Sequence, residues 1–268
     1  MQVTSPWLAI LLMQLTLSGC ASLVELPALR DDVEGEAPIQ AYARVLLKYV
    51  NDRGEVDFSA LRDGRADLDR YVAYVARTPA GAFSHPRERL AHYINSYNAL
   101  SMYNVIDLGI PETHAGWRKI RFFVLREFTI GGRPMSLYAY ENDVIRELGE
   151  PRVHFALNCV ALGCPILPKK PFTGQRLDAE LERETNKFFS ENRNLRVDHA
   201  SKIIHVSEIL DFYTEDFTPA HAPSLIAYIN RYRAEPVPED YAVRFIDYDW
   251  TIANSRRRDR PPGTALVY

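Results

Sequence analysis

The sequence predicts a single α+β domain in which a mixed or antiparallel sheet packs against several helices. The expected elements run helix, helix, helix, strand pair, helix, strand, helix, strand pair, which differs from the regular strand and helix alternation of a doubly wound sheet. The chain has 268 residues, of which 47% are hydrophobic and 25% charged, so it is long enough to bury one large core. No internal repeat or low-complexity tract divides it.

Charge and motif content argue against several classes of protein. The net charge of −3 provides no general basic field, so we expect no nucleic-acid partner. The chain also lacks a glycine-rich phosphate loop, a GxSxG elbow and an HExxH pair. The common nucleotide, serine-hydrolase and zincin mechanisms therefore lack their signatures, and we expect no cofactor.

The amino terminus has the pattern of a secretion signal followed by a lipid anchor. Residues 6–17 form an apolar run that is too short to cross about 30 Å of hydrocarbon as a helix, so residues 1–19 are interpreted as a signal peptide. "LSGC" (17–20) resembles the bacterial lipobox, although "MQVTS" lacks the usual Lys or Arg. The resemblance implies lipid on Cys20 and, because Ala21 rather than Asp follows, a location on the periplasmic face of the outer membrane.

A tether and a set of helices are expected next. Residues 20–37 contain four acidic residues between positions 31 and 36 and no sustained periodicity, which predicts a lipidated amino terminus and a flexible tether. The globular domain is expected to cover residues 38–254, and it begins with two helices predicted by apolar spacing at 38–51 and 61–77. The clearest helix is predicted from Ser84, as N-cap, to residue 109.

The second half of the chain alternates short strands with helices. Ser136 can cap a helix that runs to Leu148, and the continuous apolarity of "RVHFALNCVAL" (152–162) predicts a buried central strand. The other expected elements are a strand pair at 117–125 and 127–132, a helix at 177–191, a strand pair at 194–199 and 202–207, helices at 207–213 and 222–233, a last strand at 243–254, and a loose tail at 255–268.

Six segments in a fixed order resemble the domain of unknown function 547 family, which occurs in bacterial envelope proteins and in plants. They are "GEVDFSAL" (54–61), "AHYINSYNAL" (91–100), "SLYAYEND" (136–143), "VHFALNCVALGCPIL" (153–167), "VSEILDFYTEDF" (206–217) and "YDWTIAN" (248–254). The family has no assigned activity, and a papain-like or transglutaminase-like fold is an expectation by analogy alone. The chain departs from the family pattern at His92, usually an apolar position, and at Asn142, commonly a histidine.

A catalytic dyad of Cys159 and His154 is the first chemical hypothesis for the central segment. A thiolate nucleophile needs a base within hydrogen-bonding reach. In a flat strand these two side chains would point to opposite faces, so the dyad requires the strand to end or bulge near Asn158. Glu141 would then orient the imidazole.

Three other interpretations of the cysteines stay open. Cys159 fits as small core filling, and Cys159 with Cys164 fits as a disulfide in the oxidising periplasm. A metal site would have Cys159, Cys164 and His154 as ligands but no clustered fourth, so we expect none.

Polar residues elsewhere are candidates for a ligand pocket. Asn95 and Asn98 share one face of the predicted 84–109 helix, where they could form a polar floor or bond to neighbouring backbone. Asn158, Asp249 and Trp250 could complete the same pocket, although Asp249 and Trp250 could instead only dock the last strand.

Two functions therefore remain open. One is a membrane-anchored binding or assembly module that holds a ligand, an envelope polymer or a protein partner. The other is a cysteine-dependent hydrolase or acyl or amide transferase that acts on a peptide or envelope substrate.

Overall fold

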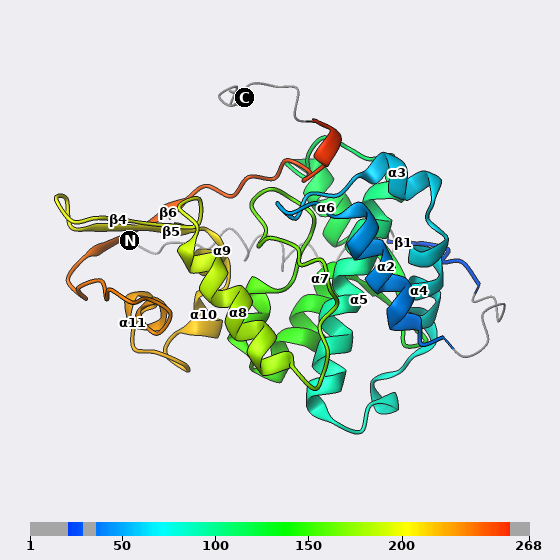
Figure 1. Cartoon of the computed structure of the whole chain (residues 1–268), viewed down its shortest axis with the longest axis horizontal. Helices are drawn as coiled ribbons and strands as arrows, with labels where there is room; N and C mark the ends of the chain where they lie inside the picture. Colours follow the sequence, from blue (N-terminus) through cyan, green and yellow to red (C-terminus); the bar gives the residue numbers. More distant parts are fainter. Residues whose placement is uncertain (1–20, 29–35, 258–268) are drawn as a thin grey trace.

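The computed structural model describes residues 21–28 and 36–257 (Figure 1). The predicted signal peptide, Cys20, part of the tether and most of the tail lie outside these residues. The start of the tail is described: Ser255–Arg257 form a short 3-10 helix, and Arg256 Nε donates to Asp57 Oδ1 at 2.7 Å.

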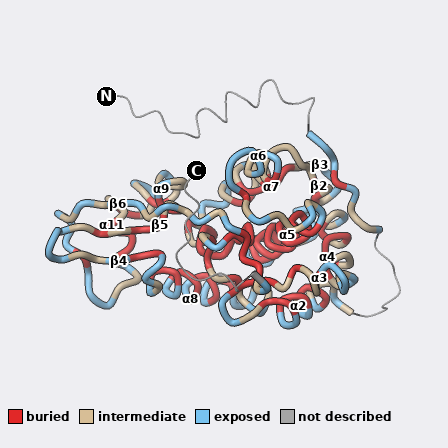
Figure 2. Tube along the Cα trace, turned by 90° about the horizontal axis from the view of Figure 1, so that it is seen from above, coloured by how far each residue is buried: buried red, intermediate tan, exposed pale blue. Residues whose placement is uncertain are grey.

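The central element of the larger part of the molecule is helix α5 (Pro86–Asp107). Every residue from Leu90 to Ile106 is buried (Figure 2), so this part of the helix is surrounded by protein on all sides, including the face that carries Asn95 and Asn98. The helix begins one residue later than predicted, because the Nδ1 of His85 rather than Ser84 accepts from a first-turn backbone N–H. Helix α4 (Ala66–Arg77) packs on α5, and α2 (Pro38–Tyr49), close to its predicted bounds, packs on α4. The predicted helix at 61–77 is interrupted at Gly64, so that its first residues belong to a separate helix, α3 (Phe58–Asp63).

A small mixed sheet covers this helical part in the order β1-β2-β3. β2 (Arg126–Ile130) and β3 (Arg133–Ser136) are antiparallel, and β1 (Ser22–Leu23) runs parallel to β2. Residues 22–24, expected in the flexible tether, thus form part of the fold, and Val24 is buried in the core.

The prediction of a strand at 117–125, the first of the expected pair, is wrong. This segment is helix α6 (Trp117–Phe123), which follows Gly116 in a left-handed conformation, φ 64°. This seven-residue helix buries Phe122 completely, and the Phe122 carbonyl accepts from Asn104 Nδ2 at 3.1 Å. Tertiary burial therefore overrides the strand propensity of the aromatic residues.

The helix predicted from Ser136 to Leu148 is present, but it changes pitch twice. Ser136 Oγ accepts from the Ala139 N–H at 3.1 Å, as expected of an N-cap. Helix α7 (Leu137–Tyr140) continues as a π-helix, η2 (Glu141–Ile145), and then as a 3-10 helix, η3 (Arg146–Leu148). Such π-turns are frequent at functional sites.

The predicted central strand at 152–162 is also wrong. Pro151 begins a 3-10 helix, η4 (Pro151–Phe155), and Glu150 caps it by accepting from the Arg152 N–H at 3.1 Å. The rest of the segment is loop. Its apolar residues are buried because they lie between packed elements, and continuous apolarity does not distinguish such a loop from a central strand.

The smaller part of the molecule is built on a second mixed sheet, in the order β4-β5-β6. Helix α8 (Leu177–Ser190) leads into the predicted strand pair β4 (Leu195–Asp198) and β5 (Ile203–Ser207). Short helices follow, namely α9 (Ile209–Phe212), α10 (Thr214–Phe217) and α11 (Leu225–Asn230), before β6 (Ala242–Ile246) adds parallel to β5. The predicted last strand ends early, and the chain beyond it makes only isolated bridges, such as Ala161 with Ile252.

Two groups of buried side chains make up the core of one α+β domain, as predicted. The larger surrounds α5, and the smaller lies between the second sheet, α8 and α11. Helix η4 joins them, because Val153 is buried in the first group and Phe155 in the second. Within residues 21–28 and 36–257, no helix is long and apolar enough to cross a membrane.

Candidate functional site

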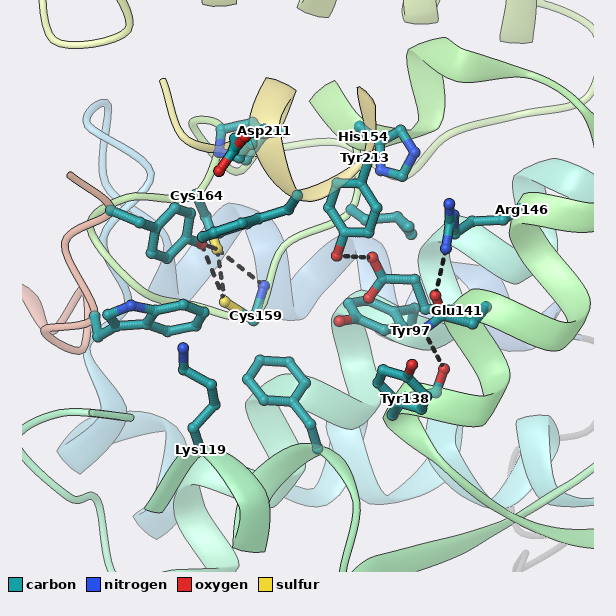
Figure 3. Close-up of a pocket in the computed structure, with 18 of the residues that line it drawn as sticks. Tyr97, Lys119, Tyr138, Glu141, Arg146, His154, Cys159, Cys164, Asp211 and Tyr213 are labelled. Carbon is teal, nitrogen blue, oxygen red and sulfur yellow. Dashed lines mark hydrogen bonds between the residues drawn. The ribbon is translucent and has the colours of Figure 1, made fainter. Parts of the chain in front are cut away.

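A partly open pocket of about 220 Å³ lies where the two cores meet (Figure 3). Its walls come from α5, α6, the π-helix η2, η4, the loop after η4, α9 and the chain after β6. Aromatic side chains dominate the walls: Tyr97, Phe123, Tyr138, Phe212, Tyr213, Tyr248 and Trp250. Such a cavity exceeds the roughly 150 Å³ that admits benzene, so an amino acid or a small dipeptide fits by size.

The loop at residues 158–165 is held in place by amide side chains. Asn98 on α5 accepts from the Asn158 N–H at 2.7 Å and donates to the Ala156 carbonyl at 3.0 Å. Asn158 in turn accepts from the Val160 N–H at 2.7 Å and donates to the Pro165 carbonyl at 2.6 Å. These bonds replace the ladder that a strand would have supplied.

Two backbone features turn this loop toward the pocket. Val160 has φ 60°, a left-handed conformation that is costly for a β-branched residue. Gly163 lies against Tyr248: an added Cβ would be 2.8 Å from the ring. The two features allow Cys159 and Cys164 to face each other beneath the Tyr248 hydroxyl.

The two thiols form a close, buried pair on the pocket wall. Cys159 Sγ and Cys164 Sγ are 2.9 Å apart, and both cysteines are free. Cys164 Sγ is also 2.9 Å from the Tyr248 hydroxyl and 3.1 Å from the Cys159 backbone N–H. Only 7% of Cys159 and 4% of Cys164 is exposed.

The environment distinguishes the two sulfurs. Burial raises the pKa of the Cys159 thiol. Burial also acts to raise the pKa of Cys164, but hydrogen bonds from Cys159 and the Tyr248 hydroxyl outweigh it and lower that pKa. Cys164 is therefore the sulfur that loses its proton first.

His154 lines the same pocket, but its partner is a carboxylate rather than a thiol. Its Nε2 is 2.7 Å from Asp216 Oδ2, and the Tyr213 ring stacks on the imidazole with a centroid distance of 4.0 Å. Asp216 also accepts from Arg146 Nε at 2.6 Å. Among the interactions of the described residues, His154 and Cys159 make no contact, so the two halves of the predicted dyad share a cavity without touching.

Glu141 also lines the pocket, in a role different from the predicted one. Its Oε1 accepts from the Tyr213 hydroxyl at 2.6 Å, and Asp216 holds the imidazole instead. Glu141 is 6% exposed, and it is the first residue of the π-helix. In the part of the chain that the structure describes, no Lys, Arg or His forms a salt bridge with its carboxylate.

Three of the predicted ligand-binding amides bond instead to the backbone. Asn95 Nδ2 donates to the Phe172 carbonyl at 2.8 Å, and its Oδ1 accepts from the Phe172 N–H at 2.9 Å. Asn98 and Asn158 act on the loop as described above. None of the three lines this pocket.

Of the two predicted residues near the end of the domain, Asp249 and Trp250, only Trp250 lines the pocket. Asp249 is exposed and accepts from the Thr251 N–H at 2.9 Å, outside the pocket lining. Trp250 lies in the lining, where Lys119 Nζ is 3.8 Å from its ring centroid. Partial burial lowers the pKa of Lys119.

Four residues of the site were not predicted from the sequence: Lys119, Asp216, Tyr213 and Tyr248. Lys119 lies in the segment predicted as a strand at 117–125, and it lines the pocket because this segment is helix α6. Asp216, Tyr213 and Tyr248 lie in the quoted segments "VSEILDFYTEDF" and "YDWTIAN", so an aromatic or acidic residue in those segments was the available signal.

The fold and site define an α+β domain with an aromatic pocket that carries a thiol pair, a buried carboxylate and a lysine. Residues 82–189 match the model of the family described as "Protein of unknown function, DUF547", and this part of the chain, which forms much of the pocket, belongs to that family. No curated protein and no solved structure matches the chain, so the papain-like or transglutaminase-like fold stays a prediction. Within the described residues, no three His, Cys, Asp or Glu side chains are grouped to hold a metal ion.

Proposed function

We propose that the protein is a lipid-anchored binding module of the bacterial envelope, whose pocket holds a small zwitterionic ligand. The anchor rests on the lipobox resemblance at Cys20. The ligand class rests on the charges of the pocket.

The observation that carries the proposal is that Glu141 is buried and has no salt bridge among the described residues. A buried carboxylate without a cationic partner is costly, because hydroxyl donors replace only part of its hydration. Glu141 is 6% exposed and accepts from the Tyr213 hydroxyl at 2.6 Å. An ammonium group on a ligand would supply the missing charge, and the rings of Tyr97, Tyr138 and Tyr213 around it suit a cation.

Lys119 supplies the opposite charge. In Figure 3 it lies at the far side of the pocket from Glu141, beside the thiol pair. In the described part of the chain it forms no salt bridge: its Nζ lies over the Trp250 ring, and the charge of Glu208 acts on it without such a bond. A ligand carboxylate would pair with it.

The other lining charges do not alter this polarity. Arg146 is neutralised, because it donates to Asp216 at 2.6 and 2.8 Å and to Glu215 at 2.7 Å. Asp211 and Glu215 are exposed, so solvent screens them. The aromatic walls between Lys119 and Glu141 favour an apolar body on the ligand.

The test is titration calorimetry with two probes of different charge separation, L-phenylalanine and the dipeptide L-alanyl-L-phenylalanine. Each is compared with its N-acetylated and its amidated form. We expect E141Q, which keeps an acceptor for Tyr213, to weaken the zwitterion about tenfold but not the N-acetylated form. K119M should weaken the zwitterion similarly but not the amidated form.

Lys48→Met, on the exposed face of α2, is the matched control and should bind as the wild type does. Absence of binding by both probes, or equal loss with blocked and unblocked probes, would contradict the proposal.

Cysteine-dependent hydrolysis is the weaker candidate. It requires a base within hydrogen-bonding reach of the sulfur, and among the interactions of the described residues His154 bonds to Asp216 and contacts neither cysteine.

A further inference from the structure

We infer that Cys159 and Cys164 form a redox-active dithiol that reduces disulfides entering the pocket, with Cys164 as the attacking sulfur and Cys159 as the resolving one. This inference concerns the thiol pair alone, and it does not depend on the zwitterionic ligand.

The two sulfurs lie close to the separation of a disulfide bond. The two sulfurs are 2.9 Å apart, and a disulfide bond would bring them to about 2.05 Å. Sulfur atoms that are already adjacent need only a small rotation of the side chains to bond. The loop between them is held at both ends by Asn158, through the Val160 N–H and the Pro165 carbonyl. The thiol pair is thus preorganised for closure.

The groups around Cys164 also support the inference. Its sulfur faces the Cys159 thiol at 2.9 Å, the Tyr248 hydroxyl at 2.9 Å and the Cys159 N–H at 3.1 Å. The N–H donates to this sulfur, and once Cys164 is ionised the thiol and the hydroxyl can donate to it as well. These bonds stabilise the thiolate, which is the nucleophile in thiol–disulfide exchange. Cys159 Sγ is farther from the same hydroxyl, at 3.4 Å.

The thiol pair is accessible from the pocket and is positioned by a strained backbone. Both cysteines line the aromatic pocket, so a disulfide can reach them without unfolding of the core. The residue between the resolving cysteine and the turn, Val160, holds a left-handed backbone conformation, φ 60°. A strained residue of this kind persists where the surroundings impose it, and here it directs Cys159 toward Cys164.

The reaction balances in two steps. The Cys164 thiolate attacks one sulfur of the substrate disulfide, forms a mixed disulfide and expels the other sulfur as a thiolate, which takes up a proton. Cys159 then loses its proton and attacks Cys164 Sγ, and the second substrate sulfur leaves as a thiol. The substrate gains two electrons and two protons, and the protein is oxidised to the Cys159–Cys164 disulfide.

The experiment uses dithiodipyridine, a neutral aromatic disulfide that releases an absorbing thione. The full chain carries C20S, so that all reactive thiols belong to the pair, and it is reduced and desalted before mixing. We expect two thiones for each protein, no bound adduct, and a final mass lower by two hydrogen atoms.

Single variants assign the order of the steps. C159S should release one thione and retain a mixed disulfide on Cys164. C164S should react at least about tenfold more slowly, because the remaining sulfur is buried and lies farther from the Tyr248 hydroxyl, at 3.4 Å. The opposite pattern would overturn the assignment, and thiols that react only in denaturant would overturn the inference.

Tyr248→Phe tests the same point in a protein that keeps both thiols. Loss of the hydroxyl donor should move the pH midpoint of the reaction upward and slow it about tenfold at neutral pH. An unchanged pH profile, with the fold verified by circular dichroism, would contradict the role given to Tyr248 in activating Cys164.

Discussion

Asp216 is the residue on which the polar side of the pocket depends. It accepts from His154 and from Arg146, and thereby joins η4, η3 and α10. Although burial acts to raise its pKa, the bonds from His154 and Arg146 hold that pKa well below its usual range. The ionised form therefore stabilises the fold above the ordinary carboxyl pKa of about 4, and this stabilisation is lost as pH falls below it.

D216N should lower the free energy of unfolding at pH 7 by roughly 2–4 kcal/mol, because it leaves the buried His154 and the half-buried Arg146 poorly paired. Urea denaturation at pH 7 and pH 3 checks this, and the difference from wild type should shrink at the lower pH. E215Q, which changes the exposed partner of the same arginine, should cost less than about 1 kcal/mol. An equal cost for both variants would show that Asp216 has no special role.

His92 is a second residue with a measurable pH signature. It is 6% exposed, and burial lowers its pKa to about 4. In the unfolded chain this histidine takes up a proton near pH 6.5, whereas in the folded chain it stays neutral down to about pH 4. The free energy of unfolding is therefore at its full value above pH 6.5 and decreases as the pH falls toward 4. His114, whose pKa is also lowered to about 4 by burial, acts in the same direction.

H92F should therefore reduce the loss of stability between pH 7 and pH 5 by about 2 kcal/mol. The ring contacts with Tyr74 and Phe83 can be kept by the new side chain. Chemical denaturation at the two pH values measures the effect, with exposed His199→Gln as control. The same slope in H92F and wild type would refute this account of His92.

At the scale of elements, the loop at residues 158–165 and its clamp on α5 decide the site. Sequence patterns predicted α2, α5, α8 and the β4–β5 hairpin, because apolar spacing and caps are local signals. They did not predict η4 or α6. Both segments are rich in apolar residues because distant elements bury them, and the same composition is typical of a strand. The sequence indicates Asn98 and Asn158 as candidate ligand-binding residues, but only the fold shows that they bond to loop backbone.

N98A should destabilise the protein by roughly 2–4 kcal/mol, since the Asn158 N–H and the Ala156 carbonyl each lose a partner. It should also increase the rate at which an alkylating reagent labels the two thiols, because release of the loop exposes them. Thermal denaturation and thiol titration measure the two effects. Asn186→Ala, on the exposed face of α8, is the matched control; if it were as damaging as N98A, the clamp would not be the cause.

At the scale of the whole molecule, the prediction of one α+β domain was correct, but two sheets and two groups of core residues form it instead of one sheet. This division could not be predicted, because it depends on which short strands pair. The pocket arises at the junction of the two groups. Its residues are therefore scattered from Tyr97 to Trp250, and no sequence motif brings them together.

Because η4 contributes to both cores, the two should unfold together. Phe122→Ala in the larger core and Phe217→Ala in the smaller one should each cost about 3–5 kcal/mol. Both should shift the same single calorimetric transition to lower temperature. Two separate transitions in either variant would contradict the assignment of one domain.

The central claim is that one cavity leads both to the charged groups and to the thiols. The most direct measurement is the rate of alkylation of reduced C20S protein by iodoacetamide, with and without L-alanyl-L-phenylalanine at ten times its dissociation constant. The account predicts that the bound dipeptide slows alkylation of Cys159 and Cys164 about tenfold. An unchanged rate at proven saturation would contradict it.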